Sequence, residues 1–165
     1  MTVRDATPAD RPRLLALNEE SEQELSELDM QRLEYILSLA HRTLVVEGEG
    51  EIAAFAIAIA PGADYDSRNY LWFGERYEQF LYLDRIAVAA PHRRNGFGAR
   101  IYDAMEDSAV PFRRMVCDVN VDPPNDVSLA FHKARGYREL GRLQHSEKAV
   151  MLLSKELAIT PVSAG

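Results

Sequence analysis

The chain has 165 residues, of which 47% are hydrophobic and 27% charged, and its formal net charge at pH 7 is -7. This composition is ordinary for one globular domain with a sizeable core, which we expect to span residues 1–157, with a flexible tail at 158–165. The negative charge argues against nucleic-acid binding, because phosphate contacts require a basic face.

The number of cysteines and the lengths of the apolar runs bear on disulfides, metal sites and membrane segments. Cys117 is the one cysteine, so the chain can form neither an internal disulfide nor a thiolate metal cluster, and we expect no metal site. Its apolar neighbours predict a buried thiol. The N-terminus lacks an apolar signal core, and no apolar run approaches the ~18 residues of a membrane span, so we expect a cytoplasmic protein that binds no membrane.

The first part of the chain predicts a strand, two helices and a hairpin. Val3 to Asp5 is strand-like, and Thr7, Pro8 and Asp10 form a helix-start signal. Asp29 can cap the second helix. The hairpin strands are expected at Thr43–Val46 and Ile52–Ile59, joined by a glycine turn at Glu47–Gly50.

The stretch from Gly62 to Gln79 is polar with interspersed aromatic residues. It is unusually long for a hairpin connection, and we expect a loop. Long loops often carry function, so this one is a candidate binding segment.

The second half alternates strands and helices, which predicts a mixed sheet with helices on both faces and thus the α/β class. The elements expected there are a strand at Phe80–Val88, a helix ending near Ser108, a strand at Met115–Val121, a short helix from Asn125 or Asp126 to Arg135 capped by Gly136, and strands near Arg138–Leu143 and Ala149–Ser154.

The segment Arg93-Arg94-Asn95-Gly96-Phe97-Gly98-Ala99-Arg100 joins a predicted strand to a predicted helix. Its glycines allow an anion to approach the backbone N–H groups, and a helix N-terminus adds about half a positive charge. No Lys-Ser/Thr pair follows Gly98, which excludes a P-loop, and Ile101 stands where a dinucleotide fingerprint needs a small residue. A phosphate loop and a plain tight turn remain as alternatives.

The octapeptide resembles the acyl-coenzyme A pyrophosphate loop of the GNAT superfamily of N-acetyltransferases, whose pattern is Arg/Gln-x-x-Gly-x-Gly/Ala. A second motif of that superfamily, Asn-x-x-Ser/Ala-x-x-Phe-Tyr-x-x-x-Gly-Phe/Tyr, is similar to the segment that follows the next predicted strand. The residues that match the second motif are Asn125, Ser128, Phe131, Gly136 and Tyr137, with His132 in the place of the tyrosine.

This resemblance implies the GNAT fold, with six or seven strands whose two central parallel members splay apart to admit the pantetheine arm of acetyl-CoA. It implies an acetyl-CoA-dependent N-acetyltransferase that acts on a primary amine of a small molecule or a peptide. The Val88 N–H would then stabilise the oxyanion. The side chains of Arg93 and Arg94 would add charge at the pyrophosphate or be plain solvated residues, and Asn125 would steady the pantetheine or only cap a helix. The implied cofactor-binding residues are Ile86, Ala87, Val88, Arg93, Arg94, Asn95, Gly96, Phe97, Gly98, Ala99, Asn125, Ser128, Phe131 and His132.

His132 is the main departure from the family pattern. A tyrosine at this place protonates the departing thiolate in many members, and an imidazolium could donate that proton instead. The alternative is that His132 only packs beside Phe131 and the cofactor.

The general base is open, because Tyr82 and Asn120 occupy the two positions where relatives have a glutamate. Asp84 shares strand parity with Tyr82, Ile86 and Val88, and Asp118 shares parity with Asn120, so each could face the cleft. We rank Asp84 first. Asp118, Glu78 and a chain of water molecules are the alternatives. The predicted catalytic residues are therefore His132, Asp84 and Val88.

The aromatic segment is expected to supply the acceptor pocket, because aromatic faces bind cationic amines. Packing against the core or against a second copy of the chain in a homodimer is the alternative. The predicted acceptor-binding residues are Tyr65, Tyr70, Trp72, Phe73, Glu78 and Tyr82. A coenzyme A-binding sensor without catalysis is the second candidate function, favoured by the missing glutamates.

Overall fold

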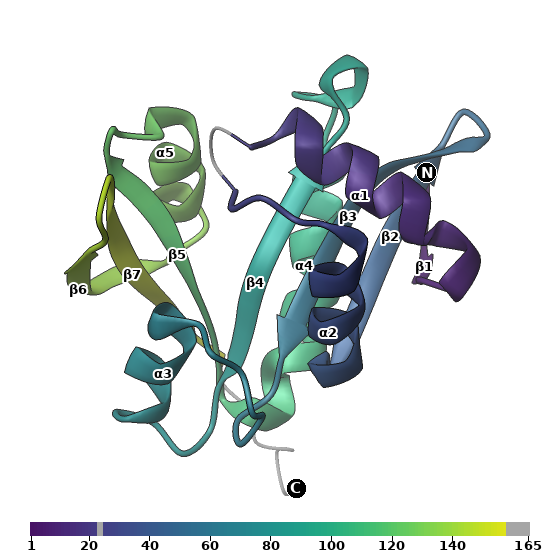
Figure 1. The fold of residues 1–165 in the computed structure, drawn as a ribbon. Coiled ribbons are helices and arrows are strands. Elements are labelled where there is room, and N and C mark those ends of the chain that lie inside the picture. The colour runs from purple at the N-terminus through teal and green to yellow at the C-terminus, as the bar shows by residue number, and fades with distance from the viewer. Residues whose placement is uncertain (23–24, 158–165) are drawn as a thin grey trace, which may run out of the picture.

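The computed structural model describes residues 1–22 and 25–157 and contains one seven-stranded sheet with helices on both faces (Figure 1). The strand order is β1-β2-β3-β4-β5-β7-β6, and the neighbours are antiparallel except for β4 and β5. This confirms the predicted mixed sheet. The strands are β1 (Thr2–Asp5), β2 (Arg42–Gly48), β3 (Glu51–Ile59), β4 (Leu81–Val88), β5 (Arg114–Asp122), β6 (Arg138–Gln144) and β7 (Ala149–Glu156). The predicted tail at 158–165 lies outside the described residues.

Two apolar clusters fill the two sides of the sheet. Residues of α1, α2 and α3 share one cluster with Phe55 and Tyr82, and residues of α4 and α5 pack in the other with Leu81 and Leu83. Figure 1 shows α1 and α2 in front of the strands and α4 behind them. None of the helices in the described part of the chain is long and apolar enough to cross a bilayer. The helices are α1 (Arg11–Glu20), α2 (Met30–Leu39), α3 (Arg68–Gly74), α4 (Phe97–Ala109) and α5 (Asp126–Ala134).

The helix-start contacts and the hairpin turn that the sequence predicts are present in the structure. The Thr7 N–H donates to the Asp10 carboxylate at 2.7 Å, and the Arg32 N–H donates to the Asp29 cap at 2.7 Å. The hairpin between β2 and β3 turns through Glu49 and Gly50, whose φ angles of 56° and 79° are those of a two-residue turn with both central residues left-handed.

The segment Gly62–Gln79 was expected to be a loop, and this expectation is wrong in part, because it contains α3. Ser67 caps the helix by accepting a hydrogen bond from the Tyr70 N–H at 3.3 Å. Tyr70 and Phe73, one helical turn apart, are 3% and 0% exposed and face the core. The aromatic residues thus have helical spacing, which the polar residues between them hide in the sequence.

The parallel pairing of β4 with β5 is short. Its register contains only Leu81 opposite Met115 and Tyr82 opposite Val116. The two strands therefore splay apart over the rest of their length, as expected for the GNAT fold.

A bulge in β4 reverses the predicted alternation of its side chains. Ile57 of β3 pairs with Arg85 and Ala58 pairs with Leu83, so Asp84 is an extra residue in the register. Tyr82 belongs to the cluster under α1 and α2, whereas Val88 packs in the cluster under α4. The predicted common parity of Asp84, Tyr82 and Val88 is therefore wrong.

The first residue of α4 packs on a glycine of β2, and this contact generates a stability prediction. A Cβ atom on Gly48 would lie 2.7 Å from Cζ of Phe97, whose ring is buried. We expect Gly48→Ala to lower the free energy of unfolding by about 1–3 kcal/mol, the usual cost of overpacking. Chemical denaturation measures it. Gly74→Ala is the control, because a Cβ atom there meets nothing within 4 Å, and equal stabilities of the two variants would contradict the prediction.

Candidate functional site

The splay between β4 and β5 opens into a cavity of about 660 Å³. The end of β4, the loop into α4, the first turns of α4 and the start of α5 form its walls. All the predicted cofactor-binding residues except Asn95 and Phe97 line it. The cavity is also lined by four residues that are not among the predicted site residues, namely Ser21, His92, Tyr102 and Val127.

The loop between β4 and α4 has the geometry of an anion site. Gly96 is the N-cap of α4 with a φ of 82°, a left-handed conformation that favours glycine. The first N–H groups of a helix have no acceptor within the helix, and they carry its positive dipole end. Gly98 lies in the first turn, and a Cβ atom there would meet nothing within 4 Å. The backbone of this turn can therefore be approached closely by a phosphate.

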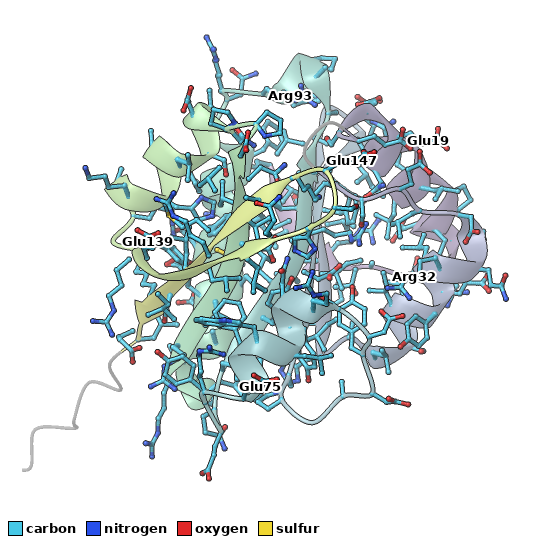
Figure 2. All side chains as sticks on the ribbon, turned by 60° about the vertical axis from the view of Figure 1, so that its left-hand side comes forward. Glu19, Arg32, Glu75, Arg93, Glu139 and Glu147 are labelled. Atoms are coloured by element: carbon cyan, nitrogen blue, oxygen red, sulfur yellow. The ribbon has the colours of Figure 1, made fainter. Side chains whose placement is uncertain are left out.

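Arg93 fastens this loop to its surroundings. Its Nε donates to the Val88 carbonyl at 3.1 Å, and its Nη2 donates to Ser21 Oγ at 3.4 Å. Figure 2 shows Arg93 at the top end of the molecule, opposite Glu75. In this arrangement the side chain joins the end of β4 to the end of α1 and still lines the cavity.

A second cavity of about 100 Å³ lies deeper between the splayed strands. Asp84 and Arg85 of β4 and Cys117, Asp118 and Asn120 of β5 contribute to its walls. Five residues line both cavities, so the two meet at their side chains. These residues are Ile86, Tyr102, Asn125, Ser128 and His132.

Two buried carboxylates face the inner cavity, and tyrosine hydroxyls donate to both. Tyr65 donates to Asp84 Oδ1 at 2.5 Å, and Arg85 Nε donates to Asp84 Oδ2 at 2.7 Å. Tyr82 donates to Asp118 Oδ2 at 2.6 Å. Burial, together with the nearby charge of Asp84, raises the pKa of Asp118 to about 6, against the lowering effect of the hydrogen bond from Tyr82. Asp118 therefore changes charge close to neutral pH.

His132 has both ring nitrogens in hydrogen bonds. Nδ1 lies 2.7 Å from the Ser128 carbonyl oxygen, which can only accept, so Nδ1 carries the proton. Nε2 lies 2.5 Å from the hydroxyl oxygen of Tyr102 and accepts from it. Burial lowers the pKa of His132 below its ordinary value. The ring is therefore mainly neutral at pH 7, which differs from the imidazolium that the sequence analysis expected.

Asn125 caps a helix, which is one of its two predicted roles; its contact with the pantetheine stays a prediction. Its side chain accepts a hydrogen bond from the Ser128 N–H at 3.2 Å and so caps α5. It also lines both cavities. The cap holds α5 in place and leaves Asn125 at the junction.

None of the residues predicted to bind an acceptor lines either cavity. Tyr65 and Tyr82 reach the inner cavity only through the carboxylates to which they donate. Tyr70 donates to the Ala60 carbonyl at 2.7 Å, and Phe73 is fully buried. Trp72 packs edge-on against Phe73, and Glu78 is exposed. The aromatic segment is thus mainly core that supports Asp84 and Asp118.

Tyr102 is the cavity residue that sequence reasoning missed most clearly. It lies on the buried face of α4 with Ile101 and Met105. In a sequence, a tyrosine at a core position of an amphipathic helix is interpreted as a packing residue. No neighbouring residue in the sequence indicates that its hydroxyl contacts His132. The residue was therefore identifiable only from the tertiary structure.

Comparison with known proteins agrees with the geometry. A family model described as the acetyltransferase (GNAT) family matches residues 10–137. That range contains both cavities' principal walls and both motifs of the sequence.

Solved structures with similar folds carry acetyltransferase names. A ribosomal-protein-alanine N-acetyltransferase from Brucella melitensis superposes with a TM-score of 0.72 at 21% identity, covering 95% of this chain and 100% of that one. The ribosomal-protein-S18-alanine N-acetyltransferase from Escherichia coli gives 0.74 at 13% identity, with coverage of 99% and 98%. A putative acetyltransferase from Salmonella typhimurium, solved with its cofactor acetyl-CoA, gives 0.72 at 18% identity, with coverage of 96% and 94%. At these identities the likeness shows the fold.

The raised pKa of Asp118 generates a prediction about stability. Below the ordinary pKa of 3.8 the carboxyl is protonated in the folded and the unfolded chain alike, and its favourable contribution is fully present. As pH rises toward the folded value of about 6, the unfolded chain loses its proton first, so this contribution is lost. We expect Asp118→Asn to gain stability over the parent between pH 4 and pH 7, on the order of 2 kcal/mol. Unfolding curves measured across that pH range check this, and a constant difference between the two proteins would contradict it.

Proposed function

Since the chain belongs to the acetyltransferase (GNAT) family, whose cofactor is acetyl-CoA, we propose that it moves an acetyl group to a primary amine of a small molecule or peptide. The amine attacks the thioester directly while both substrates are bound. The observation that carries this proposal is the junction of the two cavities. There, predicted cofactor residues and a buried carboxylate of raised pKa line connected space.

In this proposal the outer cavity holds the cofactor. The pyrophosphate lies on the backbone N–H groups of residues 94–99, and the pantetheine arm pairs with the backbone of Ile86, Ala87 and Val88. The short β4–β5 register supports this, because β4 has no partner on that side beyond Tyr82. The Val88 N–H then lies in position to donate to the oxyanion.

We assign the role of general base to Asp118 in preference to Asp84. Both oxygens of Asp84 already accept hydrogen bonds, one from Tyr65 and one from the buried cation Arg85, so this carboxylate is engaged in an ion pair. Asp118 has a pKa of about 6, close to the operating range in which a base is most effective. Asp84 would then hold Arg85 in their buried ion pair.

The acceptor class follows from these charges. Arg85 compensates the charge of Asp84 in the inner cavity, which leaves Asp118 as the carboxylate that would attract a cationic amine and take the proton that the amine must lose. Two of the similar structures are named for the acetylation of an alanine of a ribosomal protein. A peptide N-terminus is therefore one acceptor class to test beside small amines.

The second candidate function is a sensor that binds acyl-CoA without chemistry. Tyr82 and Asn120, in place of the family's glutamates, favour it. Asp118, on the same face of β5 as Asn120, supplies a carboxylate to the same cavity and favours the enzyme.

A binding experiment tests the cofactor site. We expect Gly98→Leu to abolish acetyl-CoA binding, because its side chain projects into the outer cavity from the turn that would hold the pyrophosphate. The fold should survive, since nothing lies within 4 Å of a Cβ atom at this place. Calorimetric titration with acetyl-CoA measures the affinity, with Gly98→Ala as the small-residue control. Unchanged affinity in a folded Gly98→Leu protein would place the pyrophosphate elsewhere.

A kinetic experiment tests the reaction. Release of the CoA thiol is measured over a panel of small amines and peptides, and the best acceptor is used for the variants. We expect Asp118→Asn to lower kcat by at least about tenfold and to remove the rise in rate near pH 6, because general-base catalysis is worth ~10²–10⁴-fold. Asp103→Asn, an exposed change on α4 outside both cavities, serves as the control. A parent protein that binds acetyl-CoA and acetylates none of the panel would favour the sensor.

A further inference from the structure

Two buried tyrosine rings pack edge-on against His132, and their hydroxyls have different partners. The ring centroids of Tyr102 and Tyr137 both lie 5.2 Å from that of His132, at interplanar angles of 78° and 81°. The Tyr102 hydroxyl bonds to Nε2 of His132. The Tyr137 hydroxyl donates instead to the carboxylate of Glu106 at 2.9 Å. Tyr102 lines both cavities, and Tyr137 lines neither.

The hydrogen bonds of His132 determine by which atom a proton of its ring could pass to a bound ligand. Nδ1 is held by the Ser128 carbonyl, and Nε2 is held by the Tyr102 hydroxyl. A proton that leaves Nε2 toward a bound molecule must therefore pass through the oxygen of Tyr102. Tyr102 lines both cavities, and we therefore take its hydroxyl as the outer end of this chain.

We propose that the Tyr102 hydroxyl, backed by His132, donates the proton to the departing CoA thiolate. This rests on the proposed acetyl transfer. It places the acidic hydroxyl on α4, whereas the family pattern places it on α5, at the position of His132 here. Tyr102 is then a catalytic residue, and His132 supplies its proton.

The step balances within the two side chains. The amine nitrogen has formed its bond to the carbonyl carbon, and collapse of the tetrahedral intermediate breaks the C–S bond, with the electron pair leaving on sulfur. The reactive form has a doubly protonated His132, which is the minor form at pH 7; in it Nε2 donates to the Tyr102 oxygen, and the hydroxyl is free to donate to sulfur. The thiolate takes the phenolic proton of Tyr102, and the phenolic oxygen takes the Nε2 proton of His132. His132 is left neutral with its proton on Nδ1, and exchange with solvent restores the imidazolium.

The surroundings explain why Tyr102 needs His132. Burial and the negative charges nearby raise the pKa of Tyr102 well above its ordinary value, so a free tyrosinate is strongly disfavoured. The proton must therefore be replaced as it leaves. The titratable and charged groups that act on this pair come from α4, β5 and α5, and they are Glu106, Cys117, Asp118 and Arg135.

The first experiment titrates the thiol of bound free CoA by its ultraviolet absorbance, with desulfo-CoA as the blank. An O–H donor stabilises a thiolate, so Tyr102→Phe should raise the pKa of the bound thiol by about one unit relative to the parent. Tyr137→Phe is the matched control, because it removes a hydroxyl from the other ring on His132, and its thiol should titrate like that of the parent. Equal thiol pKa values in Tyr102→Phe and the parent, or equal shifts in both variants, overturn the proposal.

Turnover gives the second readout. Tyr102→Phe should lower kcat by at least about tenfold, keep the affinity for acetyl-CoA and lose the fall in rate that the parent shows as His132 deprotonates. An unchanged kcat with chemistry rate-limiting overturns the proposal. If the parent acetylates no amine, the proposed function fails, and the thiol titration still decides the role of Tyr102.

A third measurement needs no variant. In the ¹⁵N spectrum of the parent protein, CoA in its thiolate form should shift the Nε2 resonance of His132 as the Tyr102 hydroxyl turns toward sulfur. Desulfo-CoA should not. Identical shifts with the two ligands would show that the hydroxyl stays on His132 and would overturn the proposal.

Discussion

The early end of the β4–β5 pairing is the constraint on which the rest of the site depends. The two strands share register at only two residue pairs, and beyond them the edge of β4 faces open space. A parallel sheet that continued would have filled this region with ladder hydrogen bonds and packed side chains. The splay instead leaves two connected cavities and exposes the backbone of β4 to an extended ligand.

The opening has an energetic cost, because it leaves charged groups buried beside it. Asp84 and Arg85 form an ion pair whose side chains are 4% and 5% exposed, and Asp118 lies across the gap. Buried charges are tolerated when hydrogen bonds satisfy them. Tyr65 and Tyr82 supply such bonds from the aromatic side of the core, and Asn18 of α1 accepts from Arg85 at 3.0 Å. The aromatic segment and α1 therefore stabilise the site from behind without entering it.

The sequence predicts those features of the fold that depend on interactions between residues close in the chain. The caps at Asp29 and Asn125, the glycine-containing turn before α4 and the succession of strands along the chain all follow from short patterns. The side of the sheet on which each β4 side chain lies does not follow from such patterns, because the bulge at Asp84 is defined by the register with β3. The partner of the Tyr102 hydroxyl is also non-local, since Tyr102 lies on α4 and His132 on α5, with β5 between them in the chain. Local signals thus indicate the proposed cofactor loop, whereas the proposed proton chemistry depends on tertiary contacts.

The difference in size between the two cavities has a consequence for the acyl group. The outer cavity encloses about 660 Å³ and the inner one about 100 Å³. In the proposed reaction the acyl chain and the attacking nitrogen must share the smaller space, under the side chains of Leu25 and Leu83. Each methylene added to the donor would occupy volume that the acceptor needs. If the proposed reaction takes place there, the wall that brings the nucleophile close to the carbonyl carbon also limits the length of the acyl group.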